Sequence, residues 1–225
     1  MKKNLLALLA VLAGTANAQT VLTIPINANF DDMERRTVGG VPSIDFDSSD
    51  LEFGADGGRP NTIGLRFTNI ALTPTSVVTN AYIQFTGDSA SDLAADSAPA
   101  STSFVIRGEK NVNPVTFSDT NVDDLVTRPL STATVNWTNV PSWTENARGT
   151  NERTPDLTPI INELIAQSGW ASGNALSFIV AENPTAERTA WSYERSVSDG
   201  QAINAPTLVI TIQAPADASD WAMYQ

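Results

Sequence analysis

The chain has 225 residues, with 13 basic and 25 acidic side chains, a formal net charge of −12 at pH 7, and neither histidine nor cysteine. The missing residue types exclude Ser-His-Asp triads, cysteine nucleophiles, disulfides and zinc sites of the usual kind. A negative field of this size would repel the phosphates of duplex nucleic acid, so we expect no nucleic acid partner. Carboxylate chemistry, oxygen-ligated metals and binding remain as classes of function.

Residues 1–18 have the pattern of a secretory signal peptide. Lys2 and Lys3 form a short basic start, residues 5–12 are an apolar run, and residues 16–18 (Ala-Asn-Ala) are a small-x-small cleavage signal. We therefore expect cleavage before Gln19 and a secreted protein, either periplasmic or extracellular. No later stretch approaches the roughly 20 apolar residues of a membrane span, so we expect none.

Short apolar and β-branched segments follow, separated by turn residues. Alternation of apolar and polar residues is typical of a strand with one buried face. A pair of serines, Ser48 and Ser49, is expected to break or bulge one of these strands. Strands are predicted over residues 21–26, 44–53, 63–67, 77–86, 104–107, 132–138, 175–180 and 206–212.

One segment has the period of a helix with one buried face. Its apolar residues recur at the i, i+3, i+4, i+7, i+8 spacing, and they are Leu157, Ile160, Ile161, Leu164 and Ile165. Thr158 can cap this helix and Gly169 can end it. Many short strands, one helix and no βαβ alternation predict an all-β fold, an antiparallel jelly-roll-type β-sandwich with one short helix. We expect it to span residues 19–213, with residues 214–225 as a C-terminal tail.

A series of short phrases supports the same fold class. In this order the phrases resemble the extracellular β-sandwich modules related to DNRLRE-type, carbohydrate-binding-module-like domains of secreted bacterial proteins. The resemblance implies a jelly-roll sandwich in a non-catalytic role, with polysaccharide binding or surface attachment, and it carries over no site residues. No partner catalytic domain accompanies the module in this chain. The phrases are residues 50–53, 63–70, 81–86, 106–109, 135–143, 169–174, 188–193 and 205–210.

Four aromatic residues are candidates for a sugar-binding platform. Trp143, Trp170, Trp191 and Tyr193 lie near predicted strand ends or loops, beside polar residues. Sugar rings pack their flat C–H faces on exposed aromatic rings, while nearby amides and carboxylates bind the hydroxyls. The alternative is that these rings pack in the core or at its rim, because tryptophan is usually well buried.

An acidic segment is the candidate metal site. Asp45, Asp47, Asp50 and Glu52 share the polar positions of one predicted strand. A structural Ca²⁺ ion prefers six to eight oxygen ligands of this kind, although the spacing does not match an EF-hand. The alternative is a solvated strand face, with Arg66 paired to Asp50 or Glu52 on the neighbouring strand.

Four arginines stand among these acids: Arg66, Arg107, Arg128 and Arg188. A polymer of uronic acids would need such cations, because guanidinium groups grip carboxylates with two hydrogen bonds. The negative net charge of the chain opposes such a polyanion at long range, so these cations would have to act at close contact. Structural ion pairs at the edge of the sandwich are the alternative explanation.

These observations favour a secreted, non-enzymatic protein that binds polysaccharide or a cell-surface glycan, or that attaches to the cell surface. A second hypothesis is a structural subunit of an extracellular fibre or matrix, joined to copies of itself by strand exchange with residues 19–30 as the donor. A third is a small glycan-active enzyme, which would need a concave pocket with two close carboxylates of shifted pKa.

Overall fold

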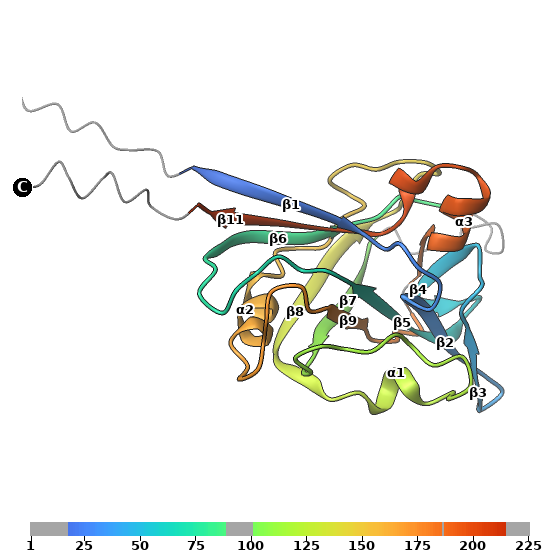
Figure 1. Cartoon of the computed structure of the whole chain (residues 1–225). Coiled ribbons are helices and arrows are strands. Elements are labelled where there is room, and N and C mark those ends of the chain that lie inside the picture. Colours follow the sequence, from blue (N-terminus) through green and yellow to red (C-terminus); the bar gives the residue numbers. More distant parts are fainter. Residues whose placement is uncertain (1–17, 89–100, 186, 215–225) are drawn as a thin grey trace, which may run out of the picture.

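The computed structural model describes residues 18–88, 101–185 and 187–214 of the chain (Figure 1). The predicted signal peptide (residues 1–18) lies outside the described residues except for residue 18, and the predicted tail (residues 214–225) does so except for residue 214. The fold is β-sandwich-like, with two antiparallel sheets, so the prediction of an all-β antiparallel fold is confirmed. The jelly-roll order of strands stays a prediction.

The smaller sheet has three strands in the order β1-β11-β6. These are β1 (Gln19–Pro25), β11 (Thr207–Gln213) and β6 (Val78–Gln84), and each pair is antiparallel. In Figure 1, β1 and β11 extend to the upper left as a ribbon, with β6 beside β11. None of the three strands contains a charged residue, and their uncharged, β-branched alternation is why the sequence predicted all three.

The larger sheet follows the order β10-β4-β5-β9-β7-β8, with the hairpin β2–β3 attached to β5. The predicted strand over residues 44–53 is broken at the two serines, because β3 ends at Asp45 and β4 begins at Asp50. The strands are β2 (Asp32–Val38), β3 (Val41–Asp45), β4 (Asp50–Asp56), β5 (Arg59–Phe67), β7 (Ser101–Glu109), β8 (Leu130–Pro141), β9 (Leu176–Val180) and β10 (Arg188–Trp191).

The two sheets share one hydrophobic core. Strand β6 contributes Ala81 and Ile83, and β5 contributes Ile63, Leu65 and Phe67, all of them 0% exposed. A second, smaller cluster (Met33, Phe117, Leu125 and Ile179) packs on the other face of the large sheet. The alternation of side chains along β9 explains the division, because Ile179 faces the second cluster while its neighbours face the main core.

The predicted helix is present as α2 (Thr158–Ile165), and it buries the predicted apolar face against the main core. Its N-cap is Leu157 rather than Thr158, whose hydroxyl instead donates to the carboxylate of Asp156 at 2.6 Å. The expectation of a single helix is wrong, because the described residues contain, besides a 3-10 helix at Ala202–Asn204, two more short α-helices. They are α1 (Asp124–Thr127) and α3 (Tyr193–Ser198), each too short to show a helical period in the sequence.

Candidate functional site

Two of the four predicted platform residues are buried. Trp170 is 5% exposed, and its indole N–H donates to the carbonyl of Leu72 at 2.9 Å. Trp191 is 2% exposed, and the guanidinium of Arg195 lies 4.3 Å from its ring centroid. Neither ring can meet a sugar in this structure, so both tryptophans have the packing role that was the alternative for them.

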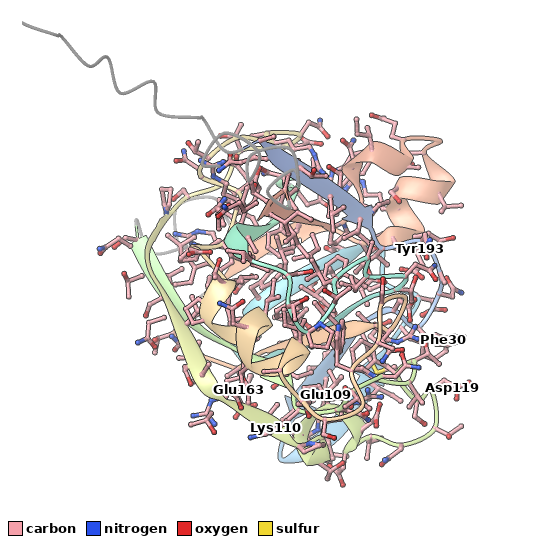
Figure 2. All side chains as sticks on the ribbon, turned by 60° about the vertical axis from the view of Figure 1, so that its left-hand side comes forward. Phe30, Glu109, Lys110, Asp119, Glu163 and Tyr193 are labelled. Atoms are coloured by element: carbon pink, nitrogen blue, oxygen red, sulfur yellow. The ribbon has the colours of Figure 1, made fainter. Side chains whose placement is uncertain are left out.

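The other two predicted platform residues are half-buried and lie in separate places. Trp143 stacks on Phe85 at 5.9 Å in the main core, and its indole N–H donates to the carbonyl of Asn151. Tyr193 opens helix α3 and lies on the same side of the molecule as Phe30 (Figure 2). No ring contact joins any two of the four aromatic residues in the part of the chain that the structure describes.

The acidic segment is not gathered around one point. Asp45 pairs with Arg36, Asp50 accepts from the hydroxyl of Ser48 at 2.8 Å, and Asp47 is exposed. Within residues 18–88, 101–185 and 187–214, no three acidic side chains form a group that could hold a metal ion. Calcium at these four positions therefore stays a prediction.

The pairing of Arg66 with Asp50 or Glu52, which belonged to the alternative of a solvated strand face, differs from the one in the structure. Arg66 pairs with Asp31 at 2.6 Å instead, because β5 has β2 rather than β4 beside it at this position. Arg128 forms an ion pair with Glu109 at 2.6 Å. This is the structural role that was the alternative explanation for the arginines. Arg188 donates to the backbone carbonyls of Val140 and Pro141.

A pair of glutamates, the buried Glu34 and the half-buried Glu52, lies where β4 separates from β5, and the sequence did not reveal it. The pairing of β4 with β5 ends at Gly54 and Asn61, so the backbone of Glu52 has no partner on β5. Side chains bond to its backbone groups instead. The carboxylate of Glu34 accepts the backbone N–H of Glu52 at 2.5 Å, and the amide of Asn61 donates to the Glu52 carbonyl at 2.8 Å. Burial raises the pKa of Glu34 well above its usual value, and the neighbouring Glu52 raises it further.

Two close carboxylates with raised pKa values are also what a glycan-active enzyme would need. Burial is likewise the main cause that raises the pKa of Glu52. The side chain of Glu34, however, is 0% exposed. A sugar cannot reach this carboxylate in the folded chain, so the pair has the geometry of a structural element.

A partly exposed surface without acidic residues lies on the outer face of the small sheet. Tyr82 and Gln84 of β6 project from this face beside Val209 of β11, because the alternate residues Ala81 and Ile83 enter the core. The neighbouring β1 adds Thr23 and the 57% exposed Val21. We call this surface the outer face, defined by Val21, Thr23, Asn80, Tyr82, Gln84, Val209 and Thr211.

Two arginines from the loop after β8 stand at the border of the outer face. The guanidinium of Arg153 lies 4.9 Å from the ring centroid of Tyr82. Arg148 donates to the hydroxyls of Thr86 and Thr207, both at 3.0 Å, and burial lowers its pKa. Neither arginine has a carboxylate partner among the described residues, in a chain of net charge −12.

The two arginines are held in place by contacts of the loop with β6. The side chain of Gln84 donates to the carbonyls of Gly149 and Glu152, at 2.9 and 3.0 Å. The carboxylate of Glu152 is turned inward, where it accepts the backbone N–H of Gly149 at 2.8 Å. The site therefore presents cations, amides and one aromatic ring without an exposed acid from its own strands.

No protein-family model matches the chain, and no curated protein matches it either. Among the described residues, no helix is both long and apolar enough to cross a membrane. Function must therefore be inferred from the geometry of the molecule itself.

Proposed function

We propose that the protein is a secreted, non-catalytic β-sandwich that attaches to extracellular carbohydrate through the outer face. Carboxylated polysaccharide is the ligand class that this face suits best. The observation that carries the proposal is the pair Arg148 and Arg153 beside Tyr82, two cations without an acidic partner among the described residues. A guanidinium offers a planar fork of donors that matches a carboxylate.

The environment of each arginine supports a carboxylate ligand. A partly buried cation without a counter-charge is unfavourable, and Arg148 has only neutral hydroxyls as partners. Arg153 is oriented by its stacking on Tyr82, so fewer rotamers need to be fixed when a ligand binds. The DNRLRE-type resemblance favours the same function, and the full burial of Glu34 favours a non-catalytic one.

The experiment is binding of the purified protein to polygalacturonate and to its highly methyl-esterified form, which has the same backbone without the charges. We expect Arg148→Gln and Arg153→Gln each to weaken binding to polygalacturonate about tenfold, the value of a hydrogen bond to a charged group. Arg107→Gln is the matched control, because Arg107 is exposed, lacks an ion pair among the described residues and lies on β7.

A second pair of variants separates the structural site from the one that the sequence predicted. Tyr82→Ala should weaken binding, whereas Tyr193→Ala, equally half-buried, should not. If Tyr193→Ala abolished binding and Tyr82→Ala did not, the binding site would be the aromatic platform predicted from the sequence and not the outer face. Binding of no polysaccharide, with and without Ca²⁺, would contradict the proposal.

A second candidate function is a structural subunit that pairs with copies of itself. The far edge of β6 is covered by residues 152–157, which bond to Ala81, Ile83 and Phe85 at 2.7–3.0 Å. The far edge of β1, by contrast, has no partner strand among the described residues. Uncharged, β-branched edge strands are the ones that other strands join.

This edge alters the expected mode of assembly. Strand β1 is paired with β11 along all seven of its residues, so it is not the free donor that strand exchange would use. Addition of a neighbour to the open edge is the alternative. Val21→Lys should then lower the mass measured by light scattering at high concentration, whereas Val105→Lys, on an exposed valine of β7, should not.

A further inference from the structure

Three neighbouring side chains each carry a buried oxygen without a hydrogen-bond donor. The oxygens are Oε2 of Glu34, Oε2 of Glu52 and Oδ1 of Asn61, and the side chains of Glu34 and Asn61 are 0% exposed. Buried polar atoms in folded proteins nearly always have a partner. The carboxyl groups of Glu34 and Glu52 are within hydrogen-bond reach of each other. The unpartnered oxygen of Asn61 belongs to an amide that donates to both residues, so the three side chains together point to a shared positive group.

Direct contacts hold the three residues together. The backbone N–H of Glu52 and the side-chain amide of Asn61 both donate to Oε1 of Glu34, at 2.5 and 3.0 Å. Both donors therefore bond to the same oxygen, Oε1 of Glu34, and Oε2 of Glu34 receives no hydrogen bond from them. The residues come from β2, β4 and β5, so the orphaned oxygens lie where three strands meet.

Neither the nearest cation nor a proton satisfies this set. The guanidinium of Arg36 is turned away to Asp45 and Asp56. A single proton shared by the two carboxyl groups would serve Glu34 and Glu52 and leave Oδ1 of Asn61 without a partner. Carboxylate and amide oxygens together are instead the ligands that a hard divalent cation prefers.

We propose that Glu34, Glu52 and Asn61 bind a divalent cation of the Ca²⁺ type. The site contains two carboxylates and an amide rather than a cluster of acids, and it shares only Glu52 with the segment that the sequence predicted. Backbone carbonyls and water would complete the six to eight ligands of Ca²⁺. The ion would bind β2 to β4 where β4 leaves β5, and so stabilise the folded state without touching the outer face.

The test is thermal unfolding of the chain after treatment with a chelator, before and after addition of CaCl₂ or MgCl₂, with calorimetric titration of the same ions. At a hundredfold excess over the Kd, we expect Ca²⁺ to raise the Tm by about 5–10 °C. Glu34→Gln and Glu52→Gln should abolish the rise. The amide introduced by Glu34→Gln keeps an oxygen for the N–H of Glu52, and Glu52 itself is only half-buried, so at least one variant should fold.

Asp47→Asn is the matched control, because Asp47 is an exposed acid of the predicted segment. It should keep the full rise in Tm. The proposal is overturned if neither ion changes the Tm of the unaltered chain, or if Asp47→Asn loses the rise while Glu34→Gln keeps it. Either result leaves the proposed carbohydrate function standing, because that function is measured on other residues.

Discussion

The carboxylate of Asp32 accepts a hydrogen bond from the backbone N–H of Tyr193, at 2.8 Å and 161 positions further along the chain. This bond ties the start of β2 to the start of α3. It also places Asp32, 2% exposed, beside Glu194, so a buried acid has a second acid as its neighbour. The pair makes the stability of the fold dependent on pH.

Burial first, and then the charge of Glu194, raises the pKa of Asp32 to about 8. Burial raises the pKa of Glu194 to about 7. Because the folded state holds these protons more tightly than the unfolded state, stability is greatest below the ordinary carboxyl pKa and falls as pH rises toward 8. We expect Asp32→Asn to flatten this fall, measured by urea unfolding from pH 5 to pH 8 in the presence of a chelator.

Glu163 gives the control of opposite sign. Its carboxylate accepts the backbone N–H groups of Ala133 and Thr132, at 2.6 and 2.9 Å, which lowers its pKa. Figure 2 shows it near Lys110, with which it pairs at 3.1 Å. The carboxylate of Glu163 stabilises the folded state at pH values above the pKa that it has in the unfolded chain, and this stabilisation is lost as pH falls. Glu163→Gln should therefore lower the free energy of unfolding at pH 7 and change it little at pH 3. A Glu163→Gln profile that matches that of Asp32→Asn would contradict both assignments.

Gly64 of β5 should tolerate no side chain. A Cβ atom there would lie 2.6 Å from Leu125 and 2.7 Å from Phe117, in the second hydrophobic cluster. We expect Gly64→Ala to lower the free energy of unfolding by about 1–3 kcal/mol through overpacking. Leu125→Ala removes one of the clashing atoms, so the double variant should be more stable than the sum of the two single changes predicts.

Arg128 should be the most costly arginine to remove. It pairs with the buried Glu109 and with Asp124, and it donates to the carbonyls of Val115 and Thr116. Arg128→Ala leaves Glu109 as an unpaired buried charge, and we expect a loss of about 3–5 kcal/mol in urea unfolding. Adding Glu109→Gln should recover part of this loss; if it recovers none, the charge of Glu109 is not the cause.

The buried tryptophans should not take part in binding. Trp170→Phe and Trp191→Phe keep an aromatic ring in the core, so we expect affinity for polygalacturonate within about twofold of the unaltered chain. Trp170→Phe should still lower the Tm, because the carbonyl of Leu72 loses its donor. A large loss of affinity with unchanged Tm would show that these rings become accessible to the ligand.

The strands of the small sheet and helix α2 were predictable because their apolar period is local in the sequence. Strand β2 was missed because Asp32, Glu34 and Arg36 make its sequence look solvated, whereas the structure buries the first two. Their burial depends on where β4 leaves β5, which is a property of the tertiary fold. The same holds for Trp170, whose partner Leu72 lies 98 positions away.

The candidate site was missed for a related reason. Tyr82 alternates with core residues, as the sequence indicates, but Arg148 and Arg153 come from a loop whose path no periodicity describes. A weak signal was present, since the three strands of the small sheet contain no charged residue in a strongly acidic chain.

The small sheet has one open edge, at β1, and one covered edge, at β6, and this limits how copies of the chain could join. A molecule with one open edge offers a single attachment point, so its valence is one. Two chains that met edge to edge at β1 would form a closed pair with a twofold axis, since the opposite edge is already occupied by residues 152–157. Growth beyond two chains would need a second, different contact, so association through β1 alone would end at a dimer of fixed mass.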